Sequence, residues 1–506
     1  MRFLRPTLTL ACLALLGRLF VPAFAADAPK PPTPEKAAEK PVPAVSLLPA
    51  DSVTHHQIML AGKTLPYTAT AGTLTLRDDK GEKEADIFYV AFTLDGVADE
   101  AHRPITYAFN GGPGAAAAYL DIGALGPRAL AFGADGRPQS ASATVGDNPD
   151  TWLPFTDLVF IDPAGTGFSR AATEDATKRL WSVGGDLDAL AQIIRLHLAK
   201  IERLTSPVYL VGESYGGFRA ARLADQLPQQ EGVPVAGAMM ISPVLEFELM
   251  EGDRFEVLSA ALRLPSYAAV AMAAHQAPTP AALADAERFA LGDYLTGLAA
   301  PLANRPKDFY AHIAEMIGVG EPIVARWAGR VPPAIYVKER DRDEGEILSR
   351  YDGTVAAPDP DPGNPNPTED PILQGTIAPF TRAFTAYARN ELGFRTDLGY
   401  RLLSDEVNHH WQWHDGNEGR RDIGAGEALA HALSLAPHLK LLVAHGMTDL
   451  TTPYMMSRYV IDHLPAKLVA ERVTLKLYPG GHMMYLRAGS RHQLREDAAE
   501  FYGVAP

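Results

Sequence analysis

Cysteine is almost absent from this chain, since Cys12 is the only one among 506 residues. The residues that follow it can therefore form no disulfide with one another, and their fold must depend on an apolar core. Hydrophobic residues make up 47% and charged residues 21%, which is ordinary for a globular protein and supports a sizeable core. The length allows several domains, or one large α/β core that carries an insertion.

Clustered positive charge is also missing from the chain. The formal net charge is −15, and no basic patch stands out. Nucleic acid is therefore not an expected partner. A membrane span is not expected either, because Arg18 and Pro22 interrupt the apolar run near the N-terminus and leave it too short to cross a bilayer.

Residues 1–25 have the features of a secretory signal peptide. Arg2 and Arg5 form a positively charged start, the apolar run Leu8–Leu16 follows, and Ala23–Ala25 fits the small-x-small cleavage pattern. Cleavage after this pattern would export the protein to the periplasm or the exterior, without stable membrane insertion. The remaining chain would be more acidic, because the leader contains arginines and no acidic residue.

A lipoprotein signal that is cut before Cys12 is the alternative. The apolar run continues past this residue, however, and Thr9 stands where an aliphatic residue is usual. Residues 26–45 are rich in Pro, Ala, Lys and Glu, a composition that cannot bury enough apolar surface to fold. We therefore expect a flexible tether before the folded part.

The folded part is expected to begin near residue 46 and to belong to the α/β class. Short apolar segments rich in β-branched residues indicate strands, and between residues 105 and 242 they alternate with helical segments. The expected strands are His56–Leu60, Thr73–Leu76, Ala85–Thr93, Ile105–Phe109, Asp157–Asp162, Pro207–Val211, Val235–Ile241, Leu439–Ala444 and Val473–Leu477. Helices are expected at 186–204, at 218–227 with Pro228 as its end, and at 491–502. This alternation predicts a mostly parallel, doubly wound sheet.

The pattern changes in the middle of the chain. Residues 258–345 look mostly helical, without a clear buried strand, and the Pro-rich segment 359–367 is typical of an irregular loop. Long insertions over the carboxyl edge of a sheet usually form lids. We therefore interpret 246–425 as a helical cap that is inserted between two parts of the core, 46–245 and 426–506.

The segment Gly212–Gly216, Gly-Glu-Ser-Tyr-Gly, lies between an expected strand and an expected helix. This is the context of a nucleophile elbow, a tight turn that holds a serine hydroxyl at the carboxyl end of a sheet. Ser214 is therefore the candidate nucleophile, and the N–H of Tyr215 points to where an oxyanion would form. A plain strand-to-helix turn is the alternative interpretation.

Two further residues follow strands in the order that an α/β-hydrolase requires. Asp449 lies just past Leu439–Ala444, and His482 lies in the loop after the last expected strand. His482 can take the proton of Ser214 and return it to the leaving group, while Asp449 holds the imidazole tautomer. Each could be a structural residue if taken alone, but their positions and chain order together favour a catalytic triad.

The loop Asn110–Gly114, Asn-Gly-Gly-Pro-Gly, follows the strand Ile105–Phe109. Gly111 and Gly112 let the backbone adopt strained dihedral angles and approach a ligand closely. After an early strand of an α/β-hydrolase, such a loop is the candidate for the second oxyanion donor. An ordinary Gly-Pro turn is the alternative.

Two patterns hint at metal sites, but no metal or other cofactor is expected. The segment 359–367 contains Asp-x-Asp-x-Gly, yet its alternating prolines forbid the loop geometry of an EF-hand. His410 and His414 are spaced as one helical turn and have Asp415 beside them, which could ligate zinc. A solvated helix end is the preferred interpretation of these histidines.

Four blocks of the sequence resemble the signature blocks of the serine carboxypeptidase family, in the family's order. They are Asn110–Gly114, Ile161–Ser169, Gly212–Gly217 and Gly481–Met483. The segment Asn148–Trp152 resembles another stretch of the family. The resemblance covers most of the chain outside the tether and is looser in the cap, and the lack of disulfides is closer to the bacterial members.

This resemblance implies an α/β-hydrolase fold and an acyl-enzyme exopeptidase that releases C-terminal residues from peptides, often best at acidic pH. By motif position, Gly112 and Tyr215 match the two oxyanion donors. Asn110 and Glu213 match residues that bind the terminal carboxylate of the peptide. No cofactor is implied, and the sequence carries no indication of an oligomeric state.

The match to the carboxylate-binding residues is incomplete. Glu213 can bind a carboxylate only when protonated, because two carboxylates in a dry site repel each other. Gly111 and Met483, which lie in the same blocks, are further candidate substrate-binding residues. Ala108 and Ala124 stand where the family has a tryptophan and a glutamate. An esterase, acyltransferase or other peptidase on this scaffold is therefore the alternative, and a non-catalytic binding protein is a third hypothesis.

Overall fold

The computed structural model describes residues 48–139, 144–251, 255–367, 369–414 and 419–504. The predicted signal peptide and tether lie outside these residues and stay predictions. No helix in the described ranges is both long and apolar enough to cross a membrane.

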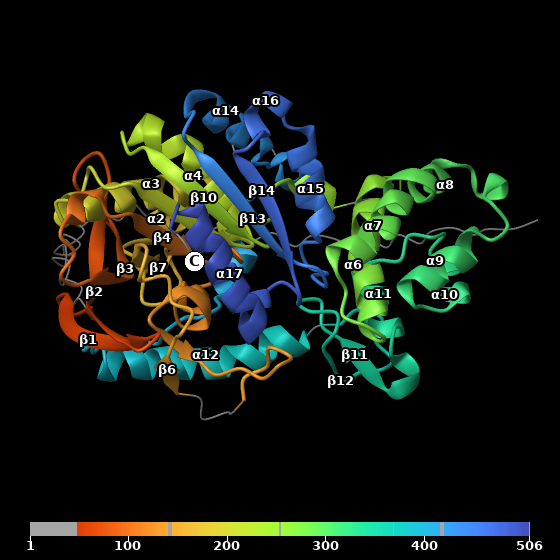
Figure 1. Cartoon of the computed structure of the whole chain (residues 1–506), viewed down its shortest axis with the longest axis horizontal. Coiled ribbons are helices and arrows are strands. Elements are labelled where there is room, and N and C mark those ends of the chain that lie inside the picture. The colour runs from red at the N-terminus through yellow and green to blue at the C-terminus, as the bar shows by residue number, and fades with distance from the viewer. Residues whose placement is uncertain (1–47, 140–143, 252–254, 368, 415–418, 505–506) are drawn as a thin grey trace, which may run out of the picture. The chain divides into compact units, whose positions relative to one another are not determined.

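A large mixed sheet lies at the centre of the fold (Figure 1), with ten strands among the described residues. The spatial order is β1-β2-β3-β7-β4-β9-β10-β13-β14, and β8 pairs with β3. These strands are β1 (Ser52–Leu60), β2 (Lys63–Arg77), β3 (Lys83–Leu94), β4 (Ile105–Phe109), β7 (Asp157–Ile161), β8 (Arg170–Ala171), β9 (Val208–Glu213), β10 (Val235–Ile241), β13 (Lys440–Gly446) and β14 (Val473–Tyr478). From β7 to β14 all neighbours are parallel, whereas β1, β2 and β3 add antiparallel pairs at one edge.

The parallel strands are covered on both faces, which explains why their sequences are continuous apolar runs. Successive side chains of a strand point to opposite faces of the sheet. Tyr107 and Leu210 accordingly belong to one apolar cluster, while their neighbours Ala108 and Val211 belong to another. The predicted α/β fold with a mostly parallel, doubly wound sheet is confirmed.

Helices pack on both faces, and Figure 1 shows α3 and α4 on one side of the sheet and α12 on the other. Helices in the first cluster are α2 (Glu174–Leu180), α3 (Val183–Lys200), α4 (Tyr215–Gln230), α5 (Phe247–Met250), α14 (Gly426–Leu435) and α15 (Tyr454–His463). Helices in the second cluster are α1 (Ala118–Leu120), α12 (Pro371–Asn390) and α17 (Ala488–Phe501). The short α16 (Ala466–Val469) precedes β14.

Helix α4 corrects one expectation from the sequence. It continues through Pro228 to Gln230, although this proline was expected to end it. Proline removes the hydrogen bond of its own nitrogen, and in the last turn of a helix few bonds remain to be lost. The helix also begins earlier than expected, at Tyr215 directly after Ser214.

The long insertion divides into two packing groups. Its first helices share an apolar cluster of their own with the hairpin β11–β12. These elements are α6 (Leu258–Ala273), α7 (Pro280–Phe289), α8 (Leu295–Ala299), α9 (Phe309–Ile317), α10 (Glu321–Arg326), α11 (Pro333–Glu339), β11 (Glu346–Leu348) and β12 (Ala356–Pro358). By contrast, Phe380 and Phe384 of α12 belong to the cluster on one face of the sheet. Residues 246–425, expected as one cap, thus contain both a separate helical group and a layer of the core.

The two patterns that hinted at metal have other surroundings in the structure. Helix α13 (Asp405–His410) ends at His410, so the helical turn expected between His410 and His414 does not form, and Asp415 lies outside the described residues. In the Pro-rich loop, the Asp359 carboxylate accepts a hydrogen bond from the buried Lys338 at 2.5 Å.

A second hairpin, β5 (Arg128–Leu130) with β6 (Val145–Asp147), lies outside the central sheet.

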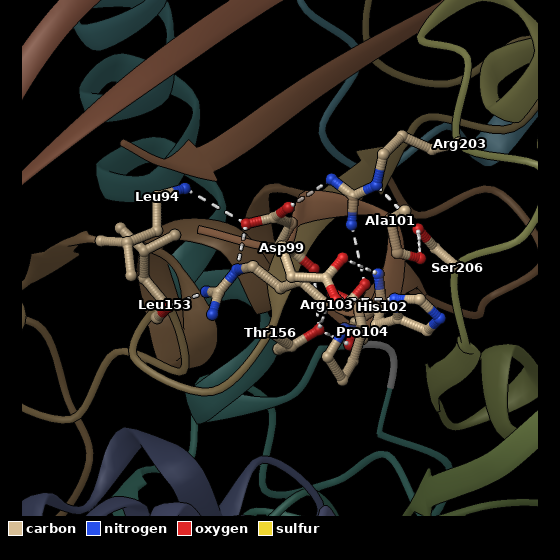
Figure 2. A network of polar contacts seen from close by, with 12 residues as sticks. Leu94, Asp99, Ala101, His102, Arg103, Pro104, Leu153, Thr156, Arg203 and Ser206 are labelled. Atoms are coloured by element: carbon tan, nitrogen blue, oxygen red, sulfur yellow. Dashed lines mark hydrogen bonds and ion pairs between the residues drawn. The ribbon is translucent and has the colours of Figure 1, made fainter. Parts of the chain in front are cut away.

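A buried polar network ties together the amino ends of the central strands (Figure 2). The carboxylate of Asp157, the first residue of β7, accepts hydrogen bonds from Arg103 Nε at 2.8 Å and Arg203 Nη1 at 2.9 Å. It also accepts the N–H of Leu94 at 3.1 Å. Arg203 Nη2 donates to the carbonyl of Arg103 at 2.7 Å, and Nε donates to Ser206 at 2.7 Å. One carboxylate thereby fixes the segments that lead into β4, β7 and β9.

We expect Asp157→Ala to lower the free energy of unfolding by about 3–5 kcal/mol, because it leaves two buried guanidinium groups without their carboxylate. Urea denaturation measures this loss. Asp147→Ala is the matched control, because Asp147 pairs with Arg128 while 49% exposed, and such pairs contribute about 0–1 kcal/mol. Equal losses in the two variants would contradict a special role for the network.

Candidate active site

The turn between β9 and α4 places Ser214 in strained backbone. Its φ is 60° and its ψ is −123°, a combination that few residues other than glycine adopt. A Cβ on Gly212 would lie 1.8 Å from the carbonyl oxygen of Gly216, so both positions need glycine. The N–H of Ser214 donates to the carbonyl of Ile241 at 2.9 Å. The neighbouring strand therefore helps to hold the turn.

The loop after β4 presses directly on this turn. A Cβ on Gly111 would lie 2.4 Å from the nitrogen of Tyr215 and 2.7 Å from the carbonyl oxygen of Glu213. Gly112 follows with a φ of 101°, which side chains other than hydrogen disfavour. Tyr215 begins α4, so its N–H is one of the donors that a helix leaves unpaired at its N-terminus. Gly112, Ser214 and Tyr215 all line one cavity.

Asp449 and His482 lie side by side beneath the same cavity. Asp449 Oδ2 is 2.8 Å from His482 Nδ1, and both side chains are almost fully buried. Thr452 Oγ1 donates to the same Oδ2 at 2.8 Å, while the backbone N–H groups of Thr451 and Thr452 donate to Oδ1 at 2.7 and 2.9 Å. These donors fix the orientation of the Asp449 carboxylate. The sequence pointed to Asp449 and His482 but not to the two threonines.

Glu213 occupies the other side of His482. Its Oε1 is 3.4 Å from His482 Nε2, and its Oε2 accepts a hydrogen bond from Asn110 Nδ2 at 2.9 Å. Asn110 is in turn oriented by the N–H of Leu120, which donates to its Oδ1 at 3.1 Å. The predicted residues Asn110, Glu213 and His482 therefore form one connected polar group.

Burial controls the protonation of this group. Desolvation raises the pKa of Glu213, and it outweighs the opposing effects of His482 and of the Asn110 amide. Desolvation also works against the imidazolium of His482, but the carboxylate of Asp449 and then that of Glu213 raise the pKa of His482 to about 9. Glu213 and His482 therefore compete for a proton within one buried site.

The cavity above these groups has a volume of about 210 Å³ and is built from two sides. One side, here called the Met483 wall, joins the apolar cluster of α12 and consists of Ala115, Tyr119, Tyr351, Leu403 and Met483. The other, here called the aromatic wall, joins the cluster of α3 and α4 and consists of Val244, Phe247, Met250 and Trp413, with Arg420 stacked on it. Ser214 lines the same cavity.

Tyr351 brings the insertion into contact with the loop that carries His482. Its carbonyl accepts the backbone N–H of His482 at 2.5 Å. Its ring meets the imidazole edge-on, with the ring centroids 5.0 Å apart and the planes at 82°. A Cβ on Gly481 would lie 1.9 Å from the same carbonyl oxygen. Nothing in the local sequence around Tyr351 signals this contact.

A buried ion pair lies behind the turn. Arg219 of α4 donates to Asp186 of α3 through Nε at 2.7 Å and through Nη2 at 3.0 Å, and both side chains are almost inaccessible to solvent. Its Nη1 donates to the carbonyl of Asn110 at 2.5 Å, and its guanidinium lies 4.9 Å from the ring centroid of Tyr215. The signal for this group was available, because Arg219 occupies a core position of α4, four residues after Tyr215.

The two departures from the carboxylate-binding set are both buried alanines. Ala108 lies within β4, and Ala124 lies in the turn at 121–125, where its carbonyl accepts a hydrogen bond from Asn148 Nδ2 at 2.7 Å. Neither methyl group can contact a carboxylate through a polar atom. Asn110 and Glu213, the other two residues predicted to bind a carboxylate, do have polar side chains at the site, and they are hydrogen-bonded to each other.

Comparison with known proteins agrees with this geometry. Residues 62–237 match the family described as serine carboxypeptidase. The retinoid-inducible serine carboxypeptidase of Mus musculus is 39% identical over 83 residues, 15% of this chain and 17% of the mouse protein. Serine carboxypeptidase-like 8 of Arabidopsis thaliana is 25% identical over 195 residues, 36% of this chain and 42% of the plant protein. The chain thus spans less than half the length of these two relatives.

The similarity to a solved structure extends over far more of the chain. The prohormone-processing carboxypeptidase Kex1(delta)p from Saccharomyces cerevisiae has a TM-score of 0.53 and 15% identity, over 86% of this chain and 91% of that chain. At this identity the likeness shows the α/β-hydrolase fold alone. The family match includes both the loop Asn110–Gly114 and the turn at Ser214. Residues 62–237 of this chain are therefore similar to the serine carboxypeptidase family.

Proposed function

We propose that this protein is a serine-type carboxypeptidase that releases C-terminal residues from peptides through an acyl-enzyme on Ser214. The observation that carries the proposal is the hydrogen-bonded pair of Asn110 and Glu213, buried beside His482 in the cavity that Ser214 lines. A hydrolase that merely cleaves esters has no need of a buried carboxyl group next to its base. A protonated carboxyl beside an amide suits the recognition of a carboxylate.

The proposed reaction uses the three predicted catalytic residues. Ser214 Oγ attacks the carbonyl carbon of the last peptide bond while its proton passes to His482 Nε2. The N–H groups of Gly112 and Tyr215 stabilise the negative oxygen of the tetrahedral intermediate. His482 then gives the proton to the departing amine, and water releases the acyl group by the same steps in reverse order. Asp449, 2.8 Å from Nδ1, stabilises the imidazolium throughout.

The 3.4 Å separation of Glu213 and His482 gives the substrate's carboxylate a further effect. One proton held between them leaves either a carboxylate with an imidazolium or a carboxylic acid with a neutral imidazole. A bound terminal carboxylate repels an ionised Glu213 and so favours the second arrangement. That arrangement both binds the substrate through the acid hydrogen and frees His482 Nε2 to act as the base.

Export of the protein is also part of the proposed function. The leader at 1–25 supports export to the periplasm or the exterior, where peptides are the proposed substrates. Gly111 supports the cavity through its close contact with the turn, and Met483 contributes to the cavity wall.

A second candidate function is an esterase, acyltransferase or other peptidase on the same scaffold. Ala108 and Ala124 favour it, because they remove two of the family's carboxylate-binding side chains. The two candidate functions differ in whether a free C-terminal carboxylate on the substrate raises kcat/KM.

Replacing the proposed nucleophile by Ser214→Ala should lower kcat by about 10⁶-fold, the loss seen when a triad loses its nucleophile. The wild-type protein should also be labelled by a serine-directed fluorophosphonate, and the variant should not. Activity of the variant within tenfold of the wild type would remove Ser214 from the mechanism. Absence of label on a folded wild-type protein would instead favour a non-catalytic binding protein.

The variant Asp449→Asn tests the partner of the imidazole. Its amide would place a donor opposite His482 Nδ1 and favour the wrong tautomer, so we expect kcat to fall by about 10⁴-fold. Steady-state kinetics and thermal denaturation should be measured together. If the melting temperature drops while kcat is kept, Asp449 has a structural role only.

The pH dependence separates a carboxypeptidase from a general hydrolase. For a blocked dipeptide with a free C-terminus, kcat/KM should fall as the pH rises through the raised pKa of Glu213, because the ionised form repels the substrate. For the corresponding peptide amide or ester, kcat/KM should instead rise towards pH 9, as His482 loses its proton. The two profiles should therefore slope in opposite directions, downward through the raised pKa of Glu213 for the free acid and upward towards pH 9 for the amide or ester.

The matched variant for this experiment is Glu213→Gln, which keeps a neutral donor at every pH. It should flatten the alkaline limb for the free-acid peptide. It should also shift the rising limb of the amide to lower pH, because one carboxylate that raises the pKa of His482 is gone. Identical profiles for the two substrates, unchanged in the variant, would favour the esterase-like alternative.

A further inference from the structure

The two walls of the cavity face different halves of a substrate. Asn110 is held by the N–H of Leu120, a residue of the same apolar cluster as the Met483 wall, and it contacts Glu213. A peptide whose terminal carboxylate binds Asn110 and Glu213 thus places its last residue against the Met483 wall. The residue before it, whose carbonyl Ser214 attacks, then lies against the aromatic wall.

The aromatic wall ends in a positive charge. The guanidinium of Arg420 lies 4.4 Å from the ring centroid of Trp413 and 5.7 Å from that of Phe247. Trp413 and Phe247 in turn contact the ring of Tyr215, directly after the nucleophile. Among the described residues that line the cavity, Arg420 is the one lysine or arginine. The acyl side of the cavity therefore combines apolar surface with one fixed cation.

Stacking leaves the hydrogen-bonding edge of this guanidinium available. Its Nε is 2.6 Å from Glu251 Oε1, and neither terminal nitrogen forms an ion pair with a described residue. An aromatic surface fixes the plane of the guanidinium, so that its donors point outward in the geometry that a carboxylate matches. The side chain is 46% exposed, so a substrate group can reach it.

We propose that the aromatic wall is an acyl-residue pocket that selects an acidic side chain, with Arg420 as the group that binds its carboxylate. This inference rests on the proposed function for the orientation of the peptide. Aspartate or glutamate immediately before the C-terminal residue would extend its methylene groups along Trp413 and Phe247. Its carboxylate would then meet the guanidinium edge.

Glu251 sets the strength of this selection. Its carboxylate already pairs with Arg420, so an acidic substrate shares the guanidinium with a competing negative charge. Removing this charge should strengthen the preference for an acidic side chain, while removing Arg420 should abolish it. The two variants should change the preference for an acidic side chain in opposite directions. A general loss of activity could not produce both results.

The experiment compares N-blocked Glu-Phe with N-blocked Gln-Phe at about pH 6, where a glutamate side chain is ionised. The measured quantity is the ratio of their kcat/KM values. We expect a ratio of about 5–20 for the wild type, as for a charge-assisted contact that is partly open to water. Arg420→Gln should bring the ratio to one or below, and Glu251→Gln should raise it above the wild-type value.

Arg421→Gln is the matched control, because it removes the same charge one residue further on. Arg421 lines a different, polar cavity with Asp225 and Glu246, so this variant should keep the wild-type ratio. A ratio near one in the wild type would overturn the proposal. An equal fall of the ratio in the Arg420→Gln and Arg421→Gln variants would also overturn it, because such a result would indicate a long-range effect of charge.

The same comparison with methyl esters of N-blocked glutamate and glutamine separates this inference from the proposed function. These esters have the acyl residue but no C-terminal residue. If the esters show the Arg420-dependent ratio while the dipeptides are not cleaved, the carboxypeptidase proposal fails and the acyl pocket stands. If the dipeptides are cleaved with a ratio near one, the pocket fails and the carboxypeptidase stands. Cleavage of neither series would overturn both.

Discussion

The close approach of three backbone segments at Ser214 determines how the rest of the site is arranged. Gly111, Gly212 and Gly216 each lie where a Cβ would come within 2.4 Å of a neighbouring backbone atom. The strained backbone at Ser214 is tolerated because such contacts hold the segments on both sides of it in place. The same contacts bring the loop with Asn110 against the start of α4. The proposed nucleophile, oxyanion donors and carboxylate-binding pair are therefore positioned by one packing constraint.

Buried charge extends this constraint outward. Arg219 links Asp186 of α3 to the carbonyl of Asn110, so it connects the helix behind the turn to the loop beside it. A guanidinium in such surroundings is stable only while every donor has a partner. Glu213 and His482, which line the cavity, differ from this ion pair because they compete for one proton. In surroundings of low dielectric, the position of such a proton is sensitive to any new charge. Paired charges thus surround the proposed site, and in the proposed mechanism the proton between Glu213 and His482 responds to the substrate.

Local sequence predicted the features that depend on neighbouring residues and missed those that depend on distant ones. β4 and β10 were predicted with their observed bounds, because strands buried on both faces are continuous apolar runs. The turn at Ser214 followed from its glycines. The packing of α12 on the sheet and the contact of Tyr351 with His482 join segments more than a hundred residues apart, and no periodicity records such pairings. The expectation that Pro228 ends α4 was wrong, because a proline in the last turn of a helix removes few backbone hydrogen bonds.

The loss of two carboxylate-binding side chains changes how charge is distributed around the nucleophile. With Ala108 and Ala124 buried and apolar, Glu213 is the predicted carboxylate-binding acid that lines the cavity. A second acid beside it would spread the proton over coupled groups and blur the response to substrate. The aromatic wall carries a positive charge on Arg420. A peptide with an acidic residue before its C-terminus would therefore meet a fixed cation on one side of Ser214 and a proton-dependent acceptor on the other, and only the second would set the pH at which it is cleaved.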